Sequence, residues 1–141
     1  MEDCVFCKII KGELPSSKIY EDDELLAFMD IQPINKGHVL VIPKQHKELI
    51  TELDNDIIGN MIVLATKINR AIRQSDITSE GINLSLADGE AAGQEVLHAH
   101  LHIIPRFRGD GFSFVFPKGY ENKPERNELD IISKKIQSHI K

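Results

Sequence analysis

The sequence predicts an α+β fold: a mostly antiparallel five-stranded sheet, one long central helix and a C-terminal helix. Short runs rich in β-branched residues, bounded by glycine and proline, indicate strands on both sides of a long stretch with helical apolar spacing. In residues 98–104, histidines alternate with apolar residues as they would in a half-buried strand. A length of 141 residues predicts a single domain over residues 1–141.

Three strands are expected before the long helix. Residues 16–20 and 24–30 flank an acidic turn, and residues 38–42 are rich in β-branched side chains and are bounded by Gly37 and Pro43. Two further strands, residues 81–87 and 96–104, are expected after the helix as a hairpin.

Asp54 is the expected N-cap of a helix over residues 55–74, which has a broad apolar face. This face is wider than one sheet usually covers. It indicates either a helix sunk deeply into its own core or a contact with a partner subunit. The helical spacing involves Ile57, Met61, Leu64, Ala65, Ile68 and Ile72, and the face is widened by Ile58, Ile62 and Val63.

The rest of the chain is less regular. Residues 88–95, which connect the hairpin strands, are rich in small residues, and an irregular tail starts at Gly109. A final amphipathic helix is expected over residues 125–140.

Composition excludes several classes of protein. Hydrophobic residues make up 41% of the chain and charged residues 28%, as in an ordinary soluble domain. The net charge of −5 argues against a nucleic-acid partner, which requires a basic surface. No apolar run approaches the ~20 residues that cross a bilayer, and the acidic N-terminus does not resemble a signal peptide. We therefore expect a cytoplasmic protein with no membrane partner.

The three alternating histidines predict a functional site. His98, His100 and His102 would project from one face of a strand, with apolar residues on the other face. Two alternatives are a purely structural strand and a His-x-His metal chelate. On an extended strand the Cα atoms of His98 and His102 lie roughly 13 Å apart, which nearly exhausts the reach of two imidazoles to a common ion. At least one of the three is therefore expected not to share a metal ion with the others.

Cys4 and Cys7 form a Cys-x-x-Cys pair whose thiolates can bind one zinc ion. A tetrahedral site needs two more ligands, and His46 with one strand histidine are the best candidates. The alternatives are a redox pair, which would need a preceding strand for which there is no room, or two unrelated thiols.

The connection between the hairpin strands is a candidate phosphate-binding loop. Its small residues let backbone N–H groups approach an anion, and predicted nucleotide contacts are Gly89, Gly93 and Gln94. The loop is not a Walker A motif, because no Gly-Lys-Ser/Thr follows it.

Four blocks, in order, resemble the histidine-triad (HIT) nucleotide-binding family, and most closely its Hint branch in the bacterial and archaeal form. The resemblance covers a core of about residues 4–105, whereas the tail and helix of residues 109–141 are generic. The blocks are residues 6–15, residues 26–31, residues 37–46 and residues 93–104, which contain the histidines.

The resemblance implies cleavage at the α-phosphate of a purine nucleotide, such as an adenosine phosphoramidate, through a covalent nucleotidyl-histidine. His100 resembles the nucleophile, His102 would bind the α-phosphate and assist the leaving group, and His38 would support the nucleophile. Alternatives are a dinucleoside polyphosphate hydrolase or a nucleotide-binding adaptor with residual activity.

The resemblance also implies a nucleotide pocket, structural zinc and a homodimer. Asp30 would accept hydrogen bonds from the ribose hydroxyls. Ala87 stands where many members carry asparagine, and Glu95 where many carry a serine that can donate to the phosphate or the leaving group. Ionised Glu95 cannot donate. The implied base pocket is Phe6, Leu14, Phe28 and Ile31, and the implied zinc ligands are Cys4, Cys7, His46 and His98.

Overall fold

The computed structural model describes residues 3–141, which divide into two compact units, one ending at Gly111 and the other spanning Phe112–Lys141. Whether the two units form the single domain that we predict over residues 1–141 stays a prediction. The first unit contains α1 (Val5–Ile10), β1 (Lys18–Glu21), β2 (Leu25–Met29), β3 (Val39–Pro43), the 3-10 turn η1 (Ile50–Glu52), α2 (Asn55–Gln74), β4 (Gly81–Ser85), the 3-10 turn η2 (Glu90–Ala92) and β5 (Leu101–Arg106).

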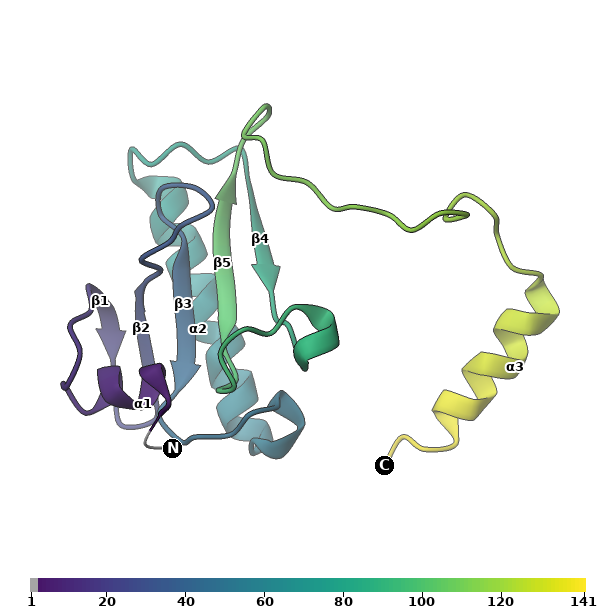
Figure 1. Cartoon of the computed structure of the whole chain (residues 1–141), viewed down its shortest axis with the longest axis horizontal. Coiled ribbons are helices and arrows are strands. Elements are labelled where there is room, and N and C mark those ends of the chain that lie inside the picture. Colours follow the sequence, from purple (N-terminus) through teal and green to yellow (C-terminus); the bar gives the residue numbers. More distant parts are fainter. Residues whose placement is uncertain (1–2) are drawn as a thin grey trace. The chain divides into compact units, whose positions relative to one another are not determined.

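The predicted fold class is confirmed. The five strands form one sheet in the order β1-β2-β3-β5-β4, and every neighbouring pair is antiparallel. The long helix α2 has the predicted bounds, and it lies across one face of the sheet (Figure 1). Asp54 has the extended backbone of an N-cap, although its side chain makes no capping hydrogen bond. In the second unit, α3 (Arg126–Gln137) is the expected last helix.

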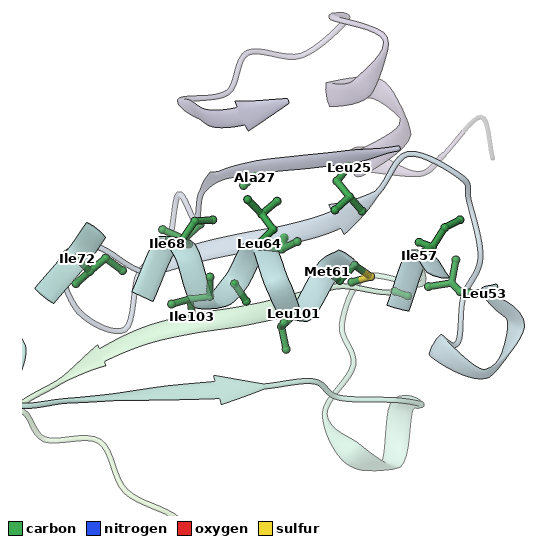
Figure 2. Close-up of a cluster of buried hydrophobic side chains, with 14 residues drawn as sticks. Leu25, Ala27, Leu53, Ile57, Met61, Leu64, Ile68, Ile72, Leu101 and Ile103 are labelled. Atoms are coloured by element: carbon green, nitrogen blue, oxygen red, sulfur yellow. The ribbon is translucent and has the colours of Figure 1, made fainter. Parts of the chain in front are cut away.

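Both faces of the sheet are covered, which explains why β2 and β3 are continuously apolar. Alternate side chains of these strands enter two separate clusters because successive residues of a strand point to opposite faces. The first cluster packs Leu25 and Ala27 against the apolar face of α2 (Figure 2). The second packs Leu26 and Phe28 against α1. All six residues of the predicted helical spacing are buried: Ile57, Met61, Leu64, Ala65, Ile68 and Ile72.

The last hairpin is shorter than predicted, because β4 ends at Ser85 and β5 starts at Leu101. The residues before β5 bond instead to the segment that follows β3: the Ala99 N–H donates to the Lys47 carbonyl over 2.7 Å. The alternation is nevertheless kept. Ala99 and Leu101 enter the cluster under α2, while the rings of His98 and His100 contact Phe6 on the opposite face.

Helix α1 was not predicted. It starts after Cys4, whose sulfur accepts a hydrogen bond from the Cys7 N–H over 3.4 Å and so caps the helix. The helix buries Phe6 and Ile9 against the sheet. None of the helices in residues 3–141 is long and apolar enough to cross a membrane.

Candidate functional site

Cys4, Cys7, His46 and His98 meet although they are far apart in the sequence, and one ligand atom from each lies within 4.8 Å of all the others. The Cys7 sulfur lies 3.3 Å from His46 Nδ1 and 3.7 Å from His98 Nδ1, and the Cys4 sulfur lies 3.5 Å from His98 Nδ1. Zinc bonds of about 2.3 Å to sulfur and 2.0–2.1 Å to nitrogen in a tetrahedron place S and N atoms about 3.6 Å apart. The four residues therefore fit a closed tetrahedral zinc site.

His98 is oriented as a metal ligand. Its Nε2–H donates to the Pro43 carbonyl over 2.7 Å, which leaves the Nδ1 lone pair directed at the two sulfurs. Burial lowers the pKa of His98, so its ring is neutral at neutral pH, as metal binding requires. Burial, followed by contact with Cys4, raises the pKa of the Cys7 thiol. A zinc ion would supply the positive charge that stabilises the thiolate.

His100 is buried beside this cluster, and its Nδ1–H donates to the backbone carbonyl of His98 over 2.7 Å. This bond assigns the proton to Nδ1, so Nε2 carries the lone pair. Burial lowers the pKa of His100 below its usual value, which favours the neutral ring. The result is an imidazole with a fixed tautomer and one nitrogen available for nucleophilic attack.

His38 and His102 form a second pair. The Ile34 N–H donates to His38 Nδ1 over 3.0 Å, so the proton of the neutral ring is on Nε2. His38 Nε2–H then donates to His102 Nδ1 over 2.9 Å, which leaves His102 with its proton on Nε2. Burial lowers the pKa of His102 to about 4, and burial also lowers that of His38. His102 is thus a neutral hydrogen-bond donor.

The ligand atoms of Asp30, His38 and His102 also lie within 4.8 Å of one another. Metal binding by His38 Nε2 would move its proton to Nδ1, where the Ile34 N–H already donates. Two donors would then face each other, at a cost of about 1–3 kcal/mol for the unpaired group. The arrangement therefore disfavours a metal ion on His38 Nε2 and is a hydrogen-bonded His38–His102 pair, with Asp30 Oδ2 3.5 Å from His38 Nε2.

A cavity of about 630 Å³ opens beside the histidines. Its apolar lining includes Val5, Ile9 and Val96, which the sequence did not single out. Phe6 in this lining contacts both Phe28 and His100, with ring centroids 5.6 Å and 5.1 Å apart. The sequence-predicted site residues in this lining are Phe6, Leu14, Phe28, Asp30, Ile31, His38, Gly93, His100 and His102.

Gly89 and Gln94, which we expected to contact the nucleotide, do not line this cavity. Gln94 is buried, and its Oε1 accepts from the Gly89 N–H over 2.7 Å. Its Nε2 donates to the carbonyls of Glu48 and Val96. Gln94 therefore fastens the loop to neighbouring segments, and the N–H of Gly89 is already occupied.

His38, which we expected to support His100, makes its direct side-chain hydrogen bond with His102. Its Nε2 contacts His102 rather than His100, whose Nδ1 is held by the His98 carbonyl. The partners that orient the four rings are largely backbone groups of Ile34, Pro43 and His98. Backbone groups carry no residue-type signal, so the sequence could not reveal them.

Comparison with known proteins decides the family. A profile of the HIT domain matches residues 11–109. The chain belongs to the HIT family. A HIT-like protein of Borreliella burgdorferi is 50% identical over 99% of this chain and 100% of its own length. An adenosine 5'-monophosphoramidase of Schizosaccharomyces pombe is 38% identical over 98% of both chains.

Solved structures agree with this membership of the HIT family. A HIT family protein from Bacillus anthracis has a TM-score of 0.90 and 41% identity, over 99% of both chains. A zinc-bound histidine-triad family protein from Mycobacterium smegmatis has a TM-score of 0.75 and 37% identity, over 99% of both chains.

Proposed function

We propose that this HIT protein hydrolyses purine nucleotides at the α-phosphate, with adenosine phosphoramidates as substrates, through a nucleotidyl intermediate on His100. The observation that carries this proposal is the fixed tautomer of His100, whose Nδ1–H is bound 2.7 Å from the His98 carbonyl in the wall of a large cavity. The relative named as an adenosine 5'-monophosphoramidase supports the substrate class.

In the first step, His100 Nε2 attacks the α-phosphorus and forms a P–N bond. The bond from phosphorus to the leaving amine breaks, its electron pair goes to the amine nitrogen, and that nitrogen takes up a proton from solvent, which the second step returns. In the second step, water attacks phosphorus, the bond to Nε2 breaks, and AMP and a proton are released. Two displacements retain the configuration at phosphorus.

His102 donates its Nε2–H to an oxygen of the α-phosphate and stabilises the charge that develops there. His38 acts as a positioning residue, because its hydrogen bond of 2.9 Å keeps the proton of His102 on the side away from His38. The rings of His38 and His102 are already held in position before the reaction, so little reorganisation is needed when the charge on the phosphate changes.

The nucleoside occupies the apolar part of the cavity. Phe6 and Phe28 are buried and provide flat surfaces for the base, with Leu14 and Ile31 at the more exposed side. Asp30 is oriented by the Gln32 N–H, which donates to its Oδ1 over 2.8 Å, and it accepts from the ribose hydroxyls.

Zinc has a structural role in this proposal. Cys4, Cys7, His46 and His98 would supply all four ligands of a tetrahedral ion, so no position would be left for water or substrate. The zinc-bound histidine-triad neighbour supports this assignment. When bound, the ion links α1 to the segment that carries His100.

We also propose that the protein is a homodimer. Ile62 and Val63 of α2 are 46% and 54% exposed, and Leu84 on the edge strand β4 is 43% exposed. An exposed apolar helix face together with an unpaired sheet edge favours association with a second copy.

The decisive test is to incubate the protein with adenosine phosphoramidate and measure AMP release, with His100→Ala as the variant. We expect wild type to release AMP and the variant to lose at least ~1,000-fold in kcat, because the covalent route is lost. Mass spectrometry of acid-quenched wild type should find a nucleotidyl adduct on His100. Equal turnover by the two proteins would refute the assignment, and tight AMP binding without turnover would favour the adaptor alternative.

A further inference from the structure

The catalytic cavity has an unusual balance of charge for a site that handles phosphate. Among the described residues that line it, the acidic side chains are Asp30 and Glu95, and there is neither a lysine nor an arginine. The histidine pair in the lining adds no compensating charge, because His38 Nδ1 accepts from the Ile34 N–H and His102 Nδ1 accepts from His38 Nε2–H, an arrangement that requires neutral rings. The acidic side chains of the lining therefore have no cationic side chain to balance them, and only hydrogen-bond donors remain to attract a phosphate.

The two carboxylates differ in their surroundings. Asp30 accepts from the Gln32 N–H and faces His38, so it is part of the hydrogen-bonded wall. Glu95 is exposed. It lines the cavity together with Val5 and Val96, and these three residues also line an adjoining hollow. Glu95 therefore stands where the catalytic cavity opens toward solvent and a neighbouring groove.

The charge of Glu95 can distinguish two substrates only through a part of the substrate whose own charge differs between them. The base and the ribose are uncharged, and the α-phosphate is the same in every substrate of the proposed reaction. The leaving group is the part whose charge varies. A cationic group near Glu95 gains attraction, whereas an anionic group is repelled with no cationic side chain of the lining to offset it.

We propose that Glu95 is a specificity-determining residue that selects nucleotides whose leaving group is an amine bearing a second, positively charged group. This inference rests on the proposed function. It makes dinucleoside polyphosphates, whose leaving group carries several negative charges, poor substrates. Glu95 does not act in the covalent step. Its attraction operates on the leaving group while the bond from phosphorus to the amine nitrogen is still intact.

The test uses three adenosine phosphoramidates of similar size. Their leaving amines are propanediamine, butylamine and β-alanine, whose far ends are cationic, neutral and anionic. For wild type we expect kcat/KM to fall in that order, with the cationic substrate at least ~10-fold better than the anionic one. This is the size expected for one partly screened charge pair. Raising the salt concentration should shrink the ratio.

Glu95→Gln removes the charge and keeps the size of the side chain, and we expect it to reduce the cation-to-anion ratio roughly five- to tenfold. Glu90→Gln is the matched control, because Glu90 is an exposed glutamate in the same loop that does not line the cavity. It should keep the wild-type ratio.

The outcomes separate the two proposals. If wild type cleaves all three substrates and Glu95→Gln keeps the wild-type ratio, the role of Glu95 is refuted and the proposed function stands. A ratio near one in wild type has the same meaning. If wild type cleaves none of the three, the proposed function fails and the selectivity fails with it.

Discussion

Zinc should hold the first unit together and also keep His100 in position. The perturbation is His46→Gln. His46 is a partly exposed side chain, and its replacement removes one of the four zinc ligands without altering α1 or residues 98–102. A ligand present at 100 to 1,000 times its Kd stabilises a fold by about 2.7–4.1 kcal/mol. Unfolding of the unit that ends at Gly111 carries an entropy of about 0.23 kcal/mol/K, at ~2.1 cal/mol/K per residue. Loss of zinc should therefore lower Tm by about 12–18 °C.

The same variant should affect catalysis through the backbone. His98 would be a zinc ligand through Nδ1, and its carbonyl accepts the Nδ1–H of His100 over 2.7 Å. A looser His98 weakens that bond, and one hydrogen bond contributes about 0.5–1.5 kcal/mol. We expect kcat for adenosine phosphoramidate to fall roughly three- to tenfold, with a smaller change in KM, since the nucleoside contacts are untouched.

The assays are zinc content by elemental analysis, Tm by calorimetry and steady-state kinetics on each protein. His139→Gln is the control, because His139 lies near the C-terminus outside the zinc cluster and should change none of these quantities. Wild type with no zinc would refute the metal site. A variant that loses zinc but melts at the wild-type temperature would refute the stabilising role.

Three further predictions concern the His38–His102 pair and the exposed face of α2. His38→Leu removes the hydrogen-bond donor to His102 and should lower kcat roughly 10- to 100-fold. His38→Gln still offers an N–H to His102 and should retain more activity. Equal losses of kcat in the two variants would contradict the tautomer assignment. Burial lowers the pKa of His102 from 6.5 to about 4, so the unfolded chain binds more protons between these values. The free energy of unfolding should fall as pH drops through this window, measured with urea, and His102→Asn should flatten the slope. Val63→Glu should convert a dimer to a monomer in light scattering, and a monomeric wild type would argue against the interface.

The fold was predictable from the sequence because its signals are local and periodic. The bounds of α2 were correct because apolar spacing and an N-cap residue agree there. Helix α1 was missed because its six residues are too few to show a helical period, and its cap is a cysteine sulfur rather than a common capping side chain. The start of β5 was set too early because residues before Leu101 alternate as a strand would while bonding elsewhere.

The sequence predicted which side chains of the site share one face of the chain, but it did not predict which ring nitrogens carry protons. Alternation placed His98, His100 and His102 on one side of the chain, and the limited reach of imidazole separated the first from the last; in the structure they belong to two different clusters. What each ring can do depends on which nitrogen carries the proton. That is decided by a carbonyl of Pro43, a carbonyl of His98 and the N–H of Ile34. Any residue type could supply the carbonyls, and any except proline could supply the N–H. The carbonyl of His98 matters most, because one residue then presents a ring to the proposed zinc ion and a backbone oxygen to the proposed nucleophile. The alternating spacing thus lets His98 contribute to the proposed zinc site while its main chain orients the ring two positions later.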